Sequence, residues 1–165
     1  MENAITSVLI QSDSNWEIII VDDGSTDNFE HIIKTYATDP RMKIFRNEKN
    51  MGCGYTKRKC VEHASGNIMG FLDPDDALTP DAITIMKEAH AIKPSHSIIH
   101  STHYICDDVM HTKRIAEYPR AIPQGIPYLL LNDGRIHHFA TFKKAHYNRT
   151  QGINATNIKA IDQDL

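Results

Sequence analysis

Three carboxylates follow a short apolar segment near the middle of the chain. Residues 68–72 are mostly apolar, and Asp73, Asp75 and Asp76 come directly after them. If the apolar residues form a buried strand, these side chains lie at one edge of a sheet, where their charges repel unless a cation neutralises them. Oxygen ligands with no cysteine nearby suit Mg²⁺ or Mn²⁺ better than zinc. The alternative is a solvated acidic turn that caps the next helix.

A second acidic pair occupies the same kind of position. Glu17–Val21 is rich in β-branched residues and predicts a short strand buried on both faces, and it runs directly into Asp22 and Asp23. Through residue 92, strand and helix patterns alternate, which is typical of parallel strands joined by right-handed crossovers. In such sheets ligands bind beyond the carboxyl ends of the strands. Both acidic groups are therefore expected at one site.

The elements that would position these groups follow from the spacing of apolar residues. Helices are expected over 4–9 and 29–36, after the glycine-rich loop 50–54, and after the cap at Thr79-Pro80 as far as residue 92. Strands are expected over 17–21, 42–45 and 67–72. Beyond Pro94 the pattern predicts a strand near 97–105, a hairpin arm near 113–118, a helix over 126–131, a strand over 136–141, a short helix over 144–148, a turn at 151–152 and a final helical start.

The composition limits the class of protein. With 165 residues, 41% hydrophobic residues and a net charge of -3, the chain is expected to form one globular domain that does not bind nucleic acid. No apolar stretch approaches the roughly 20 residues that span a bilayer, and the first residues are not those of a signal peptide. A cytoplasmic location is expected. Three cysteines without a C-x-x-C pair predict reduced thiols.

Three separated motifs occur in a distinctive order. The first is residues 15–27, with Asp22-Asp23-Gly24-Ser25 at its centre, the second is Asn50 with Gly52, and the third is residues 66–76, which end in the three carboxylates. Together they resemble the nucleotide-binding half of the inverting, family-two glycosyltransferases with the GT-A fold. Weaker matches follow at 141–144, 152–154 and 160–165. The resemblance implies an α/β domain with a mostly parallel central sheet flanked by helices, its nucleotide-binding half in 1–95 and part of the acceptor- and sugar-binding half in 96–165.

The resemblance also implies roles for particular side chains. Asp22 and Asp23 would contact the nucleotide, and Asp73 the ribose or the ion. The remaining expectations are a phosphate or base contact for Arg58, the divalent ion for Asp75 with support from Asp76, the general base for Asp162, and the rim of the sugar site for His137 and His138.

The implied reaction is transfer of a sugar, with inversion, from a nucleotide donor to a hydroxyl of a glycan or lipid-linked acceptor. The donor would be a uridine diphosphate sugar, the cofactor Mg²⁺ or Mn²⁺, and the pathway cell-surface polysaccharide biosynthesis. A homodimer and peripheral association with the inner face of the membrane stay open as partners. The sequence departs from the family pattern in three ways: the first strand is missing, Lys57-Arg58-Lys59 replaces an Ala-Arg-Asn run, and the chain stops just past Asp162, so we expect a domain truncated at both ends.

Three alternatives remain at this stage. His96, His100 and His103 have a spacing that could serve zinc, although on a strand His103 would face away from the other two. A nucleotidyltransferase would use the same sheet edge and ion, but is expected to carry an early basic, glycine-rich loop that the sequence lacks. Finally, a truncated chain could fold or dimerise through an exposed sheet edge without binding a donor.

Overall fold

Helices and strands alternate through the first 92 residues in the computed structural model, which describes residues 1–126, 131, 134–137 and 139–157. The helices expected over this part of the chain are all confirmed, with ends shifted by a few residues. In chain order the elements are α1 (Glu2–Leu9), β1 (Ile18–Asp22), α2 (Phe29–Lys34), β2 (Met42–Arg46), α3 (Cys53–His63), β3 (Ile68–Gly70), α4 (Ala82–Ile92), β4 (Ile98–His100), β5 (Tyr104–Cys106), β6 (Thr112–Ile115), β7 (Ala140–Lys143) and α5 (Lys144–Tyr147).

The first two strands form the parallel pair that the alternating pattern predicts. Ile18 lies beside Met42, and the register continues to Asp22 beside Arg46. Most of the β1 side chains are only half-buried, and Asp22 alone in the strand is buried. The prediction of a strand buried on both faces is therefore wrong for the described residues, because helices pack on β1 without enclosing it.

The second sheet is antiparallel, which corrects the prediction of a mostly parallel sheet. Among the described residues β7 lies between β3 and β4 and runs antiparallel to both, with Met69 and Ile98 each opposite Phe142. The α/β class stands, but within the described part of the chain parallel pairing is confined to β1 and β2. The reason is that β7 comes from the carboxyl-terminal half of the chain and enters between two earlier strands, whereas a helical crossover would have aligned it parallel.

The strand expected near 97–105 is two strands that belong to different sheets. β4 pairs with β7, whereas β5 pairs with β6 in a separate hairpin. Between β4 and β5 the strand is interrupted at Ser101, whose N–H donates to the Phe139 carbonyl at 3.2 Å. The expected hairpin arm is confirmed as β6, and the strand predicted over 136–141 is found later, as β7. The helix predicted over 126–131 and the final helical start lie largely outside the described residues.

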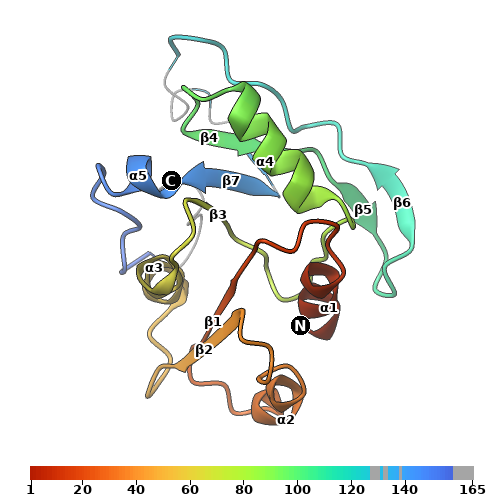
Figure 1. Ribbon diagram of the computed structural model, residues 1–165, viewed down its shortest axis with the longest axis vertical. Helices are drawn as coiled ribbons and strands as arrows, with labels where there is room; N and C mark the ends of the chain where they lie inside the picture. Colours follow the sequence, from red (N-terminus) through yellow and green to blue (C-terminus); the bar gives the residue numbers. More distant parts are fainter. Residues whose placement is uncertain (127–130, 132–133, 138, 158–165) are drawn as a thin grey trace.

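Two clusters of apolar side chains among the described residues hold together the helices and strands shown in Figure 1. In the first, Ile5 of α1 and Ile33 of α2 pack with Met42 of β2. In the second, Val61 of α3 packs with Phe142 of β7 and with Met69 and Phe71 at β3. The same helix α3 also packs against β1. One helix therefore touches both sheets and fixes the place of the β3 end relative to the β1 end.

Glu17, just before β1, joins three parts of the chain. Its carboxylate accepts hydrogen bonds from the backbone N–H groups of Ser65 (2.6 Å) and Gly66 (2.7 Å), and from Lys43 Nζ at 2.8 Å. Burial alone would raise the pKa of Glu17, but these donors outweigh it and lower the pKa to about 2. The side chain therefore ties β1 and β2 to the turn that follows α3.

Gln11 plays a similar part at the end of α1. Its buried amide donates to the carbonyls of Ser7 (2.9 Å) and Thr79 (2.7 Å) and accepts from the Ile83 N–H at 3.0 Å. The bonds to Thr79 and Ile83 connect the end of α1 to the start of α4.

The three cysteines are free thiols, as predicted. None of the described helices is long and apolar enough to cross a membrane.

Candidate functional site

The two carboxylates at the end of β1 have different surroundings. Asp22 is buried, and one of its oxygens accepts the Ser25 N–H at 2.9 Å. The other oxygen lies 3.1 Å from Arg46 Nε, a neighbour that the parallel register supplies. A carboxylate that is enclosed in this way holds the turn after β1. Of the two side chains expected to contact a nucleotide, Asp22 is thus engaged within the protein.

The Asp23 carboxylate accepts hydrogen bonds from the glycine-rich loop and from Asn47. Its Oδ1 accepts from Asn47 Nδ2 and from the Met51 N–H, both at 2.8 Å, and its Oδ2 accepts from the Gly52 N–H at 2.8 Å. Burial would raise the pKa of Asp23, but these donors, with the Thr56 hydroxyl, lower it. Asp23 therefore stays ionised at the amino end of α3, where the helix dipole favours a negative charge.

The loop can adopt this shape because of two glycines. Gly52, the residue before α3, has φ of 91°, a conformation that side chains with a Cβ rarely adopt. Gly24 has φ of 76°, and a Cβ at that position would lie 2.8 Å from the Lys49 carbonyl carbon. The turn after β1 and the loop before α3 are therefore in direct contact.

The predicted acidic group at the end of β3 forms a turn. The Asp76 N–H donates to the Asp73 carbonyl at 3.1 Å, and Asp75 at the tip is exposed. Asp73 is paired with Lys57 of α3, with 3.4 Å between Oδ1 and Nζ. The Lys57 ammonium also lies 5.1 Å from the centre of the Phe71 ring. We refer to residues 73–76 as the acidic turn.

Helix α3 contacts both acidic groups. Gly52 and Thr56, at its start, contact Asp23, and Lys57 contacts Asp73. The structure thus brings Asp23 and the acidic turn to the same end of one helix, as expected from the strand ends.

The segment 152–157 packs on the same end of α3. The Gly54 N–H donates to the Asn157 carbonyl at 3.0 Å, and a Cβ on Gly54 would lie 2.5 Å from the Asn154 carbonyl oxygen. Arg58, predicted to contact phosphate or base, instead donates to the Ile153 carbonyl at 3.2 Å and faces Glu62 at 3.5 Å. Residues 152–157 are therefore held against the end of α3 that contacts the acidic groups.

Of the remaining predicted residues, His137 contacts other aromatic rings and the others lie outside the described part. His137 stacks on His103, with ring centres 4.8 Å apart, and meets Tyr118 edge-on at 5.1 Å. This aromatic group is built around β5, β6 and the chain before β7. Asp162 and His138 lie outside the described residues.

The acidic turn offers ligands that suit a hard divalent cation. Over residues 1–126, 131, 134–137 and 139–157, no three histidine, cysteine, aspartate or glutamate side chains are grouped so that they could hold a metal ion. A structural zinc site needs four such ligands, so the histidine alternative has no support here. Mg²⁺ is commonly held by one or two carboxylates together with substrate phosphates and water. The exposed Asp75 with Asp76 fits that smaller requirement for Mg²⁺ or Mn²⁺.

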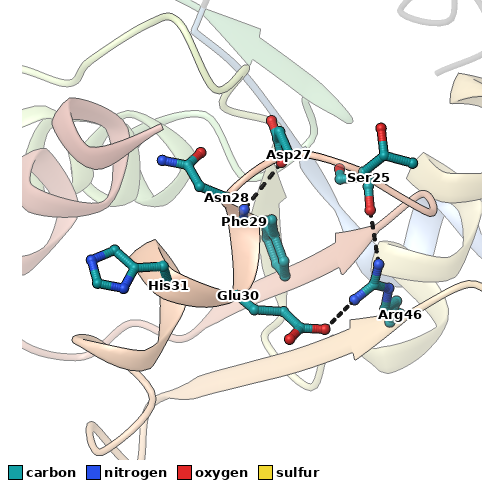
Figure 2. Close-up of a pocket in the computed structure, with 8 residues that line it drawn as sticks. Ser25, Asp27, Asn28, Phe29, Glu30, His31 and Arg46 are labelled. Atoms are coloured by element: carbon teal, nitrogen blue, oxygen red, sulfur yellow. Dashed lines mark hydrogen bonds and ion pairs between the residues drawn. The ribbon is translucent and has the colours of Figure 1, made fainter.

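A shallow pocket beside the first acidic pair is a separate feature (Figure 2). The Arg46 guanidinium donates to the Ser25 carbonyl at 2.8 Å and pairs with Glu30, which closes one side of it. The full lining is Ser25, Thr26, Asp27, Asn28, Phe29, Glu30, His31 and Arg46. Neither Asp23 nor the acidic turn lines this pocket, so we do not place the site there.

Comparison with known proteins identifies the family. The model of glycosyl transferase family 2 matches residues 1–154. The chain belongs to glycosyl transferase family 2. This match gives the nucleotidyltransferase alternative no support.

Relatives in this family include enzymes of polysaccharide synthesis. The chain is 29% identical to a chondroitin synthase of Escherichia coli over 98% of its own length and 23% of that protein. It is 39% identical to the putative teichuronic acid biosynthesis glycosyltransferase TuaG of Bacillus subtilis, over 50% of the chain and 33% of TuaG. It is 30% identical to the putative colanic acid biosynthesis glycosyl transferase WcaA of Escherichia coli, over 72% of the chain and 43% of WcaA. The chain thus spans less than half of each of these relatives.

Solved structures confirm the GT-A fold of this family 2 chain. The structure of S. aureus TarS 1-349 in complex with UDP superposes with a TM-score of 0.69, at 21% identity, over 98% of the chain and 48% of TarS 1-349. The complex of the same protein with UDP-GlcNAc gives a TM-score of 0.61 over 88% of the chain and 42% of that protein.

Sequence reasoning misses two residues of the candidate site. Asn47 follows β2 and donates to Asp23, and nothing in its neighbourhood in the sequence marks it. Lys57 belongs to the run 57–59, for which no contact with Asp73 is expected from the sequence. A signal was present, because Lys57 stands four residues before the buried Val61 and so lies on the same helix face. Lys59, by contrast, pairs with Glu62 at 2.9 Å on the outer side.

Proposed function

We propose that this chain is the donor-binding part of a glycosyltransferase that transfers a sugar from a uridine diphosphate sugar to a hydroxyl acceptor, with inversion and with Mg²⁺ or Mn²⁺. The observation that carries the proposal is that Asp23 and the acidic turn both contact the amino-terminal half of α3 in a family 2 chain. The TarS complexes with UDP and UDP-GlcNAc support the choice of donor. Relatives named for chondroitin, teichuronic acid and colanic acid support a glycan or lipid-linked acceptor.

In this proposal the described residues have separate roles in binding the donor. Asp75 and Asp76 would hold the cation, which would offset the negative charge on the leaving nucleoside diphosphate. Asp23 fixes the glycine-rich loop, so that backbone groups of this loop face the nucleotide in one geometry, and its remaining lone pairs can accept from the base or ribose. Arg58 holds the segment 152–157 in place beside them.

The bond changes follow from inversion. An acceptor hydroxyl oxygen attacks the anomeric carbon from the face opposite the diphosphate. The new carbon–oxygen bond forms as the bond to the diphosphate oxygen breaks, and the nucleoside diphosphate leaves with that electron pair. In our proposal the proton of the hydroxyl passes to the carboxylate of Asp162, which acts as general base.

The proposal is tested by calorimetric titration of the purified chain with UDP, UDP-GlcNAc and other nucleotide sugars, with and without Mn²⁺. We expect uridine nucleotides to bind, and Mn²⁺ to increase their affinity. In Asp75→Asn this increase in affinity should be smaller by tenfold or more. Asp108→Asn, at an exposed position of the β5–β6 hairpin, is the matched control and should bind as the unmodified chain does.

Two results would contradict the proposal. Unchanged Mn²⁺-dependent affinity in Asp75→Asn would remove the cation from the acidic turn. No heat with any nucleotide sugar would instead favour the alternative in which this chain folds without binding a donor.

A further inference from the structure

Lys57 is held against the acidic turn in a way that its neighbours on α3 are not. Its side chain is 16% exposed, against 35% for Lys59 on the same helix. Its ammonium lies 3.4 Å from Asp73 Oδ1 and 5.1 Å from the centre of the Phe71 ring, so both contacts come from the end of β3. A long cationic side chain that is largely buried and faces a carboxylate neutralises that carboxylate.

The carboxylates of the acidic turn are therefore not equivalent. Asp73 already has a positive partner, whereas Asp75 is exposed at the tip and forms no ion pair with any residue that the structure describes. A divalent cation that approached Asp73 would meet the ammonium of Lys57, and the two positive charges would repel. This repulsion is weaker if the cation sits further out, toward the tip.

We propose that Lys57 is a built-in counter-ion of Asp73 that competes with the divalent cation for this carboxylate. Lys57 is thus a positioning residue: it keeps the acidic turn seated on α3 before any cation is bound, and it directs the cation to Asp75 and Asp76. This inference rests on the proposed function in one respect, the binding of a cation at the acidic turn. It predicts that removing the charge of Lys57 increases the affinity for the cation, whereas removing a residue that supports a site usually lowers the affinity.

The test measures Mn²⁺ binding by the loss of the free-ion electron paramagnetic resonance signal, with and without UDP, and needs no turnover. Lys57→Met keeps the length and much of the apolar stem of the side chain but removes its charge. We expect Mn²⁺ to bind threefold to tenfold more tightly in this variant, which is the effect of removing one charge about 6 Å from a divalent ion in water-like surroundings. Lys59→Met changes the net charge equally on the same helix and should alter the affinity less than twofold.

A second substitution isolates the pair. In an Asp73→Asn background the carboxylate for which Lys57 competes is gone and only the direct repulsion between Lys57 and the cation remains, so Lys57→Met should strengthen Mn²⁺ binding by a smaller factor than it does with Asp73 present. If Lys57 only holds the acidic turn in place, Lys57→Met should weaken Mn²⁺ binding. Circular dichroism serves as the control that each variant is folded. The inference is overturned if Lys57→Met and Lys59→Met behave alike, or if the gain persists in full without Asp73.

These outcomes are separable from those of the proposed function. If Mn²⁺ binds the unmodified chain and Asp75→Asn abolishes the binding, the cation site stands and the lysine variants judge this inference alone. If Lys57→Met binds Mn²⁺ where the unmodified chain does not, competition by Lys57 is supported directly. If no variant binds Mn²⁺, both the cation site and the competition are refuted.

Discussion

Replacement of Glu17 by glutamine should destabilise the protein in a way that depends on pH. Glu17 is 20% exposed, and its carboxylate is bound by Lys43 and by the N–H groups of Ser65 and Gly66. A glutamine can offer only one acceptor oxygen, and its amide N–H group would face one of these donors. The variant therefore loses an ion pair and leaves one hydrogen-bond donor facing another.

The size of the effect follows from the pKa. A fall from 4.5 to about 2 corresponds to at most about 3 kcal/mol, since each tenfold change in acidity is worth about 1.4 kcal/mol. Lys43 is 42% exposed, so water and salt screen part of this interaction. We expect a loss of about 1.5–2.5 kcal/mol in the free energy of unfolding at pH 7.

The pH dependence has a definite sign. Because the pKa of Glu17 is lower in the folded state, its stabilisation is complete above the unfolded-state pKa near 4.5 and is lost as the pH falls through about 2. The difference between Glu17→Gln and the unmodified protein, measured by urea denaturation, should shrink to less than about half by pH 3. Glu88→Gln, at an exposed position of α4, is the control and should cost under about 0.5 kcal/mol at either pH. A difference that is the same at pH 7 and pH 3 would refute this reasoning.

Two further substitutions test how the site is fastened. Gly54→Ala would normally stabilise a helix, but here the new Cβ meets the carbonyl oxygens of Asn154 and Asn157, so we expect a loss of about 1–3 kcal/mol by thermal or urea unfolding, together with weaker UDP binding. A more stable Gly54→Ala would mean that the segment 152–157 does not rest on α3. Gln11→Ala removes two hydrogen bonds to the start of α4 and a third to Ser7 of α1, and it should cost about 2–3 kcal/mol without changing UDP affinity. A cost below about 0.5 kcal/mol would show that water replaces these bonds.

Much of the amino-terminal half was predictable because its signals are local. The β-branched run 18–21 predicts β1, and the glycine at 52 predicts the break before α3, since only nearby residues decide these features. The position of Asp23 and the acidic turn at one edge follows from a general rule about strand ends. The prediction that these groups would lie together is confirmed as far as their shared contact with α3.

The carboxyl-terminal half was harder to predict because its partners are distant in sequence. Three short strands occupy 98–115, and their local pattern does not say that β4 pairs with β7 while β5 pairs with β6. Asp23 and Lys57 show the same limit at the level of side chains. Whether Asp23 faces a nucleotide or a backbone amide, and whether Lys57 faces water or Asp73, depends on packing between elements that the sequence order does not reveal.

The place of β7 between β3 and β4 has a consequence for how the chain assembles during synthesis. β1, β2 and the first two helices make contacts within the first 46 residues and can form early, whereas Met69 must wait for Phe142 before its strand is paired. Until then β3 and β4 each present an unpaired edge, which is the kind of surface that associates with other chains. The half of the molecule that carries the acidic turn is therefore completed last, and a nascent chain halted before residue 140 holds the first sheet without the second.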